Sequence, residues 1–270
     1  MNIIETIQKR HSVRTYTGEP LHNEHIAQIE QYINQLQAPF GTKARIELIS
    51  TISDGKPVKL GTYGYIKDAC DFFVLIYEEA PFAATAAAYM FEQVVLFCTD
   101  LSLGTCWLGG AFNRSDFKKQ IQLKPNEQLR IVSPVGYYVN DDKKRFVEKY
   151  IVHANKNHVS RKPFEEIFFD ENFNHSLTEN TAGIFCQPLE MVRLAPSANN
   201  KQEWRALLEN KALHFYKEPY IDIIDDIDMG IALCHFELTC KELGIGGKFE
   251  IVKDFPNNDK IKYVISWIWN

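Results

Sequence analysis

Two long, mostly apolar segments that each end at a Leu-Gly pair constrain the fold of this chain more than any other feature. Residues 83–103 precede Gly104, and residues 227–243 precede Gly244. Each segment is predicted to be a helix that its glycine closes just past the last turn. Because a helix that is apolar on most of its sides is usually buried, we expect both helices to pack in the middle of the molecule.

The surroundings of the two segments correspond as well, in order and pattern more than in identity. Three further pairs of segments match: residues 3–7 with 164–168, Ala38-Pro39 with Ala195-Pro196, and 129–139 with 261–268. This arrangement indicates an internal repeat. We therefore predict that the chain consists of two halves of similar pattern, residues 1–160 and the shorter 161–270. We expect the halves to pack as one compact unit about an approximate two-fold axis.

The remaining elements favour the α+β class. Short runs bounded by turn signals predict strands at 45–50, 72–77, 105–108, 129–139, 204–208, 212–216 and 261–268, the fifth and sixth forming a hairpin. Pro134 indicates an edge or a bulge in its strand. Helices are predicted at 23–36 with Asn23 as cap, at 115–121, around Phe146, Val147, Tyr150 and Ile151, at 164–169, and before Pro196. We expect a central mixed, mostly antiparallel sheet flanked by helices.

Composition argues against several classes of protein. The 270 residues are 45% hydrophobic and 24% charged, as in globular proteins, and the net charge of −5 argues against nucleic-acid binding. The sequence has no membrane-length apolar run and no secretory signal, so we expect a cytoplasmic protein with no membrane partner. Its six cysteines form no CxxC pair and its eight histidines lack completing ligands, so we expect no metal site.

Ile3, Ile4 and Ile7 predict a short helix, and a basic segment follows it that reads Arg10-His11-Ser12-Val13-Arg14. Two guanidinium groups with a hydroxyl between them suit a phosphate group and a polar ring edge, because arginine offers fixed, bidentate donors. The same residues are also compatible with a solvated basic end of a helix.

A loop of small and amide residues lies in the other half, and it reads Pro196-Ser197-Ala198-Asn199-Asn200. Such a loop can bring backbone N–H groups and short polar side chains close to a ligand, although most loops of this kind are plain connections. Gly109-Gly110 could likewise let the backbone approach a planar ligand or could form only a turn.

Each half carries one of these two segments and lacks the other. Residues 170–174 of the second half are acidic and amide where the first half is basic, and residues 39–43 of the first half lack the serine. We therefore predict one complete site within one chain, with no need for oligomerisation. At the opposite site, Asp170 and Glu171 would repel a phosphate group.

Four segments together resemble the nitroreductase family: residues 10–16, 103–110, 161–166 and 195–204. They are similar to its opening basic box, its helix-to-strand segment beside the flavin, its closing basic segment, and the loop that a homodimeric member donates from its other subunit. The resemblance covers nearly the whole chain and is closest to a branch in which two nitroreductase-like halves are fused. Glu203 stands where that loop usually has proline, and Ala198 where many members have serine.

The resemblance implies bound FMN and a role for each matching residue. Arg10 and Arg161 would hold the phosphate with His11 and Ser12 beside it, and Arg14 would face the pyrimidine edge of the ring. Backbone N–H groups near the flavin N5 and residues that cover the ring would come from Leu108, Gly109, Gly110, Pro196, Ser197, Ala198 and Asn200. Thr62, Tyr63 and Gly64 are weaker candidates near the ring.

The resemblance also implies an activity, namely transfer of hydride from NAD(P)H through FMN to a nitroaromatic, a quinone or a similar acceptor. No catalytic side chain is predicted, because the flavin carries the reaction. Two alternatives remain open from the residues alone. One is a non-enzymatic flavin-binding or sensing protein on the same fold, and the other is a structural protein without flavin.

Overall fold

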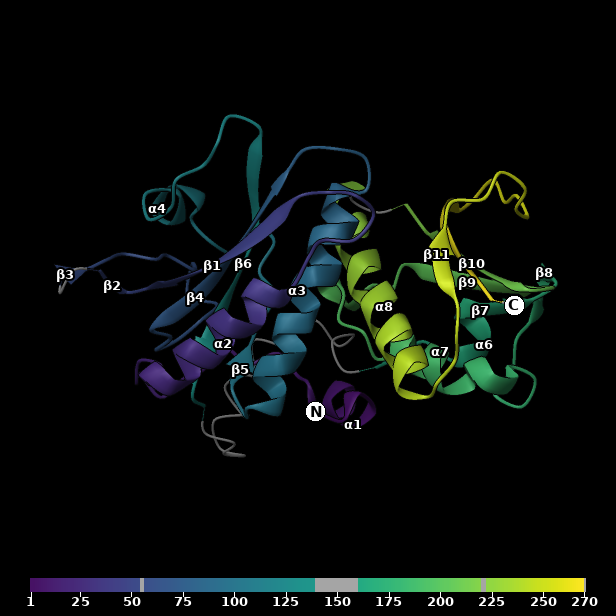
Figure 1. Cartoon of the computed structure of the whole chain (residues 1–270), viewed down its shortest axis with the longest axis horizontal. Helices are drawn as coiled ribbons and strands as arrows, with labels where there is room; N and C mark the ends of the chain where they lie inside the picture. The colour runs from purple at the N-terminus through teal and green to yellow at the C-terminus, as the bar shows by residue number, and fades with distance from the viewer. Residues whose placement is uncertain (54–55, 139–159, 220–221, 270) are drawn as a thin grey trace. The chain divides into compact units, whose positions relative to one another are not determined.

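The computed structural model describes residues 1–53, 56–138, 160–219 and 222–269, and Figure 1 traces its helices and strands. Contacts divide the chain into two compact units, residues 1 and 9–156 in the first and residues 2–8 and 157–270 in the second. The predicted helical core around Phe146, Val147, Tyr150 and Ile151 lies outside the described residues. Each unit contains a sheet and a long helix of its own.

The sheet of the first unit has four strands in the order β1-β4-β6-β5, and all of its pairs are antiparallel. The strands are β1 (Ala44–Ser50), β4 (Asp71–Glu78), β5 (Gly104–Thr105) and β6 (Glu127–Gly136). A separate small hairpin joins β2 (Ile52–Ser53) to β3 (Lys56–Pro57).

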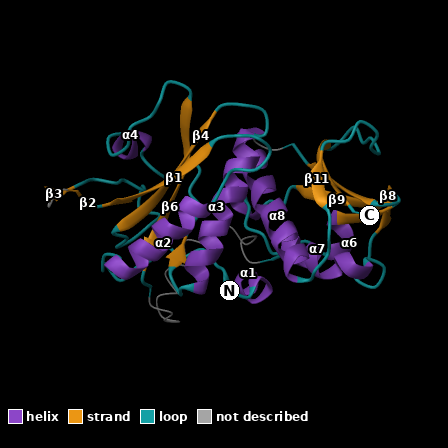
Figure 2. Ribbon diagram, viewed as in Figure 1, coloured by secondary structure: helices purple, strands orange, loops and turns teal. Residues whose placement is uncertain are grey.

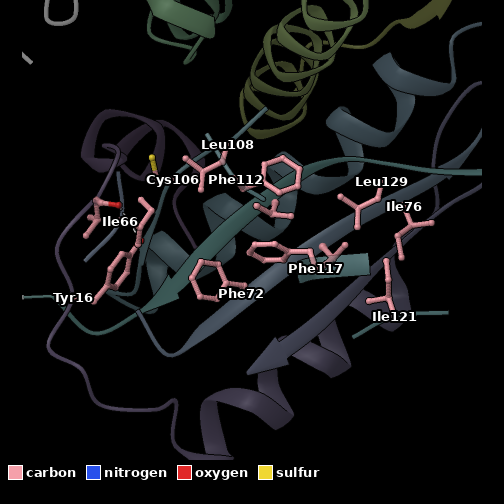
Figure 3. Close-up of a cluster of buried hydrophobic side chains, with 13 residues drawn as sticks. Tyr16, Ile66, Phe72, Ile76, Cys106, Leu108, Phe112, Phe117, Ile121 and Leu129 are labelled. Carbon is pink, nitrogen blue, oxygen red and sulfur yellow. Dashed lines mark hydrogen bonds between the residues drawn. The ribbon is translucent and has the colours of Figure 1, made fainter. Parts of the chain in front are cut away.

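Strand β4 is the centre of the first unit, because both of its faces are buried. On one face Phe73 meets Phe91 of helix α3 (Ala83–Asp100) edge to face, with ring centroids 5.7 Å apart. On the other face Phe72, Val74 and Ile76 join a buried apolar cluster that Figure 3 shows. The alternation follows from the two-residue period of a strand, and a strand covered on both faces can be apolar throughout.

Helix α3 packs on the first sheet, and α2 (Asn23–Gln35) packs on α3 (Figure 2). The contact between the two helices includes Tyr32 and Phe97, whose stacked rings lie 4.2 Å apart. The prediction that Asn23 caps α2 was wrong, because Asn23 is its first helical residue. The N-cap is His22, and the His22 side chain makes no capping hydrogen bond. A short helix α4 (Arg114–Lys118) is capped by Asn113, whose side chain accepts the Ser115 N–H.

The sheet of the second unit has six strands in the order β11-β12-β10-β9-β7-β8. The strands are β7 (Phe168–Asp170), β8 (Asn172–Ser176), β9 (Trp204–Glu209), β10 (Ala212–Lys217), β11 (Lys248–Glu250) and β12 (Lys262–Ile268). Only the β7–β9 pair is parallel among these described strands. The predicted hairpin is confirmed, since β9 and β10 pair across Asn210, which has φ 52°.

Helices of the second unit pack on a core of aromatic rings. They are α1 (Ile3–Lys9), α6 (Phe164–Ile167), α7 (Cys186–Arg193) and α8 (Asp222–Glu242), with 3₁₀ turns η1 (Gly183–Phe185) and η2 (Ala198–Asn200). Phe236 of α8 lies 5.1 Å from Phe215 and 5.4 Å from Trp267 between ring centroids. The start of α1 joins this unit, where the Ile3 N–H donates to Glu242 at 2.6 Å.

The two sheets share a strand order. In each unit an antiparallel pair of strands is followed by a long helix, then by a short edge strand and a last strand that pairs with the second strand of the first pair. The first sheet runs β1-β4-β6-β5, and the matching part of the second runs β9-β10-β12-β11. Strands β7 and β8 extend the second sheet beyond β9.

The prediction of one central sheet was wrong, because the strands form two main sheets. Pro134 does not mark an edge or a bulge. Strand β6 lies inside its sheet with Pro134 opposite Phe72, and the irregularity in that pairing falls between Leu75 and Ile76. Ser133, the residue before Pro134, uses its side chain in the contact with the neighbouring segment. Its hydroxyl accepts the Cys106 N–H at 3.0 Å.

Several helix ends also differ from the prediction. Helix α3 ends at Asp100, and the left-handed residue after it is Ser102, with φ 61°, while Gly104 lies in β5. Gly244, in contrast, closes α8 as predicted, with φ 69°. Helix α6 is a single turn, because Phe168 and Phe169 belong to β7 and pair with β9.

Among the described residues, no helix is long and apolar enough to cross a membrane. The same residues contain no group of three or more histidine, cysteine, aspartate or glutamate side chains placed to hold a metal ion.

Candidate functional site

The basic segment of the first unit runs along the edge strand β5. The Val13 N–H donates to the Thr105 carbonyl at 2.8 Å, and Ser12 bridges Thr105 in parallel. One residue further on, the Lys67 N–H donates to the Arg14 carbonyl at 2.8 Å. Backbone pairs on both sides therefore hold the segment extended, and neighbouring side chains point to opposite sides of it.

Arg10 occupies an electrostatically mixed environment in the first unit. Burial lowers its pKa and the charge of Arg14 adds to that effect, while Glu92 and Cys106 oppose it. Glu92 is fully buried in α3 and accepts the Trp107 indole N–H at 2.8 Å. The Nε of Arg10 is buried and has no hydrogen-bond partner in the described part of the chain. A buried guanidinium donor without a partner suits an anionic ligand.

His11 lies on the other side of the basic segment. It is exposed, its ring meets Tyr138 edge to face at 5.5 Å, and its Nδ1 lies 3.1 Å from the Lys9 carbonyl. It shares a cavity of about 280 Å³ with Lys9, Val13, Thr99, Ser102, Leu103, Gly104 and Tyr138. Small-molecule pockets usually hold about 300 to 1,000 Å³, so this cavity is small for a whole flavin nucleotide.

The predicted backbone contacts at residues 108–110 divide into two kinds. Leu108 is engaged, since its N–H donates to the Val132 carbonyl at 2.9 Å and its carbonyl accepts the Val132 N–H at 3.1 Å. Its side chain belongs to the buried cluster of Figure 3. The N–H groups of Gly109 and Gly110 form no hydrogen bond with any residue that the structure describes. These two glycines are therefore the donors available to a ligand.

Hydrogen bonds hold the turn at residues 61–64 against the region of α4. The Asn113 N–H donates to the Gly61 carbonyl at 2.8 Å, and the Gly61 N–H donates to Asp116 at 3.3 Å. Thr62 is buried, whereas Tyr63 is 68% exposed and, like Gly64, has a positive φ. Tyr63 is thus an exposed aromatic side chain on a turn that the α4 region holds in place.

In the second unit, two separately predicted residues are in contact. The Arg161 guanidinium donates to the Asn200 side-chain oxygen and, at 3.0 Å, to the Leu194 carbonyl. The Asn200 amide in turn donates to the Ser160 carbonyl at 2.7 Å. Arg161 is therefore oriented by the loop that follows α7, and it belongs to the same unit as that loop.

Gln202 completes the loop, and sequence reasoning did not single it out. Its side-chain oxygen accepts the Lys162 N–H at 2.8 Å, and its backbone N–H donates to the Ser197 hydroxyl at 2.9 Å. It is buried and has φ 53°, next to Asn199 and Asn200, which are also left-handed. Three positive-φ residues in four positions explain the amide-rich sequence, because asparagine tolerates that conformation best after glycine.

Two buried carboxyl groups lie behind the same loop and were also missed as functional candidates. Asp228 of α8 accepts the Ala198 N–H at 2.8 Å. Burial and then the charge of Glu203 raise the pKa of Asp228 well above its usual range. Burial raises the pKa of Glu203 to about 7, and neither of its carboxyl oxygens has a hydrogen-bond partner in the described structure.

The predicted site residues therefore form two sets. The first unit holds Arg10, His11, Ser12, Arg14, Leu108, Gly109 and Gly110, and the second holds Arg161, Pro196, Ser197, Ala198 and Asn200. Within the first set, His11 and Leu108 are directed elsewhere, to a small cavity and to the core. Within the second set, Arg161, Asn200, Ser197 and Ala198 share one hydrogen-bonded loop with Gln202 and Asp228.

Comparison with known proteins gives one family match over most of the chain. Residues 2–240 match a family model described as "Putative TM nitroreductase". No curated protein matches the sequence.

Solved structures include a full-length likeness. A protein described as a "putative nitroreductase" from Thermotoga maritima MSB8 has a TM-score of 0.61 and 22% identity, over 99% of this chain and 94% of that chain. A nitroreductase with bound FMN from Bacteroides fragilis has a TM-score of 0.41 and 16% identity, over 52% of this chain and 89% of its own. An FMN-dependent nitroreductase from Clostridium difficile has a TM-score of 0.40 and 15% identity, over 51% and 88%. The first likeness establishes the fold.

Proposed function

The chain belongs to the nitroreductase family described by that model, and from this premise we propose that it is an FMN-dependent oxidoreductase. It would transfer hydride from NAD(P)H to a nitroaromatic, a quinone or a similar small acceptor. FMN, when bound, supplies the redox chemistry, so no side chain has to act as a nucleophile or a general base.

One observation carries the proposal, namely the buried, unpartnered Nε of Arg10 beside a second guanidinium, that of Arg14. A positively charged donor with no partner in the described structure is costly unless a ligand completes it. A phosphate group supplies both the negative charge and the acceptor oxygens. Ser12 lies on the same side of the extended segment, and it can add a hydroxyl contact.

The glycine pair suits the ring of FMN. The N–H groups of Gly109 and Gly110 are available among the described residues, and Gly110 has no atom within 4 Å of where a Cβ would stand. A flat ligand can therefore approach the backbone there. Leu108 would contribute shape alone, since Val132 takes both of its backbone polar groups.

The second set would add the loop of the second unit. Asn200 and the Leu194 carbonyl orient Arg161, which fits a role as a second cation for the phosphate. Pro196, Ser197 and Ala198 would cover the ring. We propose that both sets are needed to bind one FMN per chain, without oligomerisation.

We also infer that the chain consists of two nitroreductase-like halves, residues 1–160 and 161–270. The shared strand order of the two sheets supports this inference, and so does the matching position of the long helices α3 and α8. Packing of the halves about an approximate two-fold axis stays a prediction.

Flavin titration of the purified chain tests the proposal. FMN should bind with a ratio near one per chain, and the loaded protein should oxidise NADH or NADPH in the presence of a quinone or a nitroaromatic compound. Binding without turnover on either donor would favour a flavin-binding or sensing protein. Failure to bind FMN at micromolar concentration would overturn the proposed function.

A further inference from the structure

Three carboxyl groups are buried together in the second unit, behind the loop at residues 197–202. Glu203 at the start of β9 is 3% exposed, and Asp225 and Asp228 of α8 are 1% and 4% exposed. Buried carboxylates are normally paired with cations or hydrogen-bond donors, because burial without a partner disfavours the charged form. Their arrangement therefore decides how many protons this cluster holds.

Asp228 has a clear structural partner. It accepts the Ala198 N–H at 2.8 Å, which ties the first residue of η2 to the N-terminal third of α8. Two further bonds shape the same loop, from the Gln202 N–H to the Ser197 hydroxyl at 2.9 Å and from Arg161 to Asn200. The Asp228 contact joins the loop to helix α8.

Glu203 has no such partner on either oxygen within the described residues. Its surroundings hold charges of both signs. Asp225 and Asp228 face it from α8, Lys162 from the segment before α6, and Lys201 from the loop itself. Beyond Lys162 lie Arg205 of β9 and Glu218, which form an ion pair at 2.6 Å.

These contacts disfavour two simultaneous negative charges on Glu203 and Asp228. Like charges in a poorly solvated site repel each other strongly, and one of two such carboxyl groups keeps its proton to higher pH. Lys162 offsets this repulsion only in part. Burial lowers the pKa of Lys162 and so disfavours its charged form, and Lys162 also forms an ion pair with Glu218 at 3.6 Å. The proton lies most naturally on Glu203, since Asp228 already accepts an N–H.

We propose that Glu203 and Asp228 together hold one proton, which lies on Glu203, and that ionisation of Glu203 weakens the anchor of Asp228 on the Ala198 backbone, because the two buried charges then repel each other. The loop at residues 197–202 then has an ordered form that loses its anchor when both groups become charged. The consequence for FMN rests on the proposed function, since that loop would cover the ring. Asp228 is a positioning residue in this proposal and touches no reacting atom.

Amide hydrogen exchange of the FMN-free chain between pH 6 and pH 9 tests the proton sharing. After correction for the intrinsic pH effect, protection of residues 197–202 should fall by at least about tenfold as the pair loses its proton. Glu203→Gln should keep protection constant across this range, because one charge is removed for good. Glu179→Gln, which removes an exposed carboxylate of the same unit, should behave like the parent chain.

Two results would overturn the proposal: protection that does not change with pH in the parent chain, or an unchanged pH response in Glu203→Gln. Asp228→Asn gives a second check if Glu203→Gln folds poorly, since its amide oxygen can still accept the Ala198 N–H and its pH response should vanish.

FMN titration at pH 6 and pH 9 separates this proposal from the proposed function. Weaker binding at pH 9 only in chains that keep Glu203 would support both. A pH-dependent loop in a chain that never binds FMN would leave the proton sharing intact and remove the flavin role. Equal FMN affinity at both pH values, with a loop that responds, would overturn the link between them.

Discussion

The two units share a strand order and differ in the charges that they bury. In the first unit, Arg10 lies in the field of the buried Glu92, which also accepts the Trp107 indole N–H. In the second, Glu203 and Asp228 are buried carboxyl groups that repel each other. The same topology thus holds a buried cation that suits an anion and a buried acid pair that suits a proton. Topology follows from apolar patterning, which leaves the few buried charges free to diverge.

The segments that follow the two matching short helices, α1 and α6, also differ in charge. Residues 10–14 run along β5 and carry the cations, whereas residues 170–174 run from the end of β7 through Glu171, which has φ 58°, into β8. In the second unit the corresponding residues belong to a strand hairpin and include no arginine, whereas the first-unit segment carries Arg10 and Arg14. This difference predicts one anion site in the chain rather than two.

The largest expected effect comes from Arg10→Ala. The change removes a charge-assisted contact to phosphate, which should weaken FMN binding by about a hundredfold. Fluorescence titration of the apoprotein with FMN measures the loss. Lys43→Ala serves as the control, because it removes one exposed positive charge from the same unit and should leave the affinity unchanged. Equal losses in the two variants would mean that net charge, and not a site at Arg10, attracts the ligand.

A smaller effect is expected on the free energy of unfolding when Gly104 or Gly244, the glycines that follow the two long helices, is replaced by alanine. A Cβ on Gly104 would lie 2.8 Å from Val13 and 2.9 Å from Tyr138, so Gly104→Ala should cost about 1 to 3 kcal/mol through overpacking. Gly244 has open space and φ 69°, so Gly244→Ala should cost only about 1 kcal/mol of backbone strain. Denaturant unfolding measures both free energies, and a smaller cost for Gly104→Ala than for Gly244→Ala would contradict the difference in mechanism.

The third effect is the pH dependence of stability that Glu203 confers. Its pKa is raised from 4.5 to about 7 in the folded chain, so the folded state binds the extra proton between these values. The stabilisation is complete below about pH 4.5 and is lost as pH rises through about 7, by about 3 kcal/mol. Unfolding of Glu203→Gln should show this part of the pH dependence removed. A parallel pH dependence in both chains would exclude Glu203 as its source.

Much of the fold could be predicted from the sequence because apolar periodicity is a local signal. The helices α3 and α8 and the β9–β10 hairpin follow from such patterns, and so does the end of α8 at Gly244. The division into two sheets could not be predicted, since strand pairing depends on contacts far apart in sequence. Gly104 was misassigned for a related reason: its constraint is the nearby Val13, which no local pattern reveals.

The candidate site shows the same limit. Residue types placed Arg10 and the loop at 196–200 among the candidates, but the hydrogen bond between Arg161 and Asn200 needed coordinates. Asp228 and Gln202 were missed because a helix carboxylate and a loop amide look ordinary in a sequence. Glu203 stood out only as a departure from the family pattern, and its burial without a hydrogen-bond partner in the described structure needed coordinates.

The smallest expected effect is that of Asp170→Ala. Asp170 is half-buried in the β7–β8 hairpin, at the place in the sequence pattern that corresponds to the basic segment. If the second unit offers no anion site, removal of this charge removes no contact with FMN, and FMN affinity should shift by less than about twofold. Flavin released from a known amount of the variant should still give a ratio near one per chain. A loss as large as that of Arg10→Ala would contradict the single site. A ratio near two in the variant would show that the acidic hairpin alone had closed a second, equivalent site, and the contrast between the units would then be one of charge rather than of backbone shape.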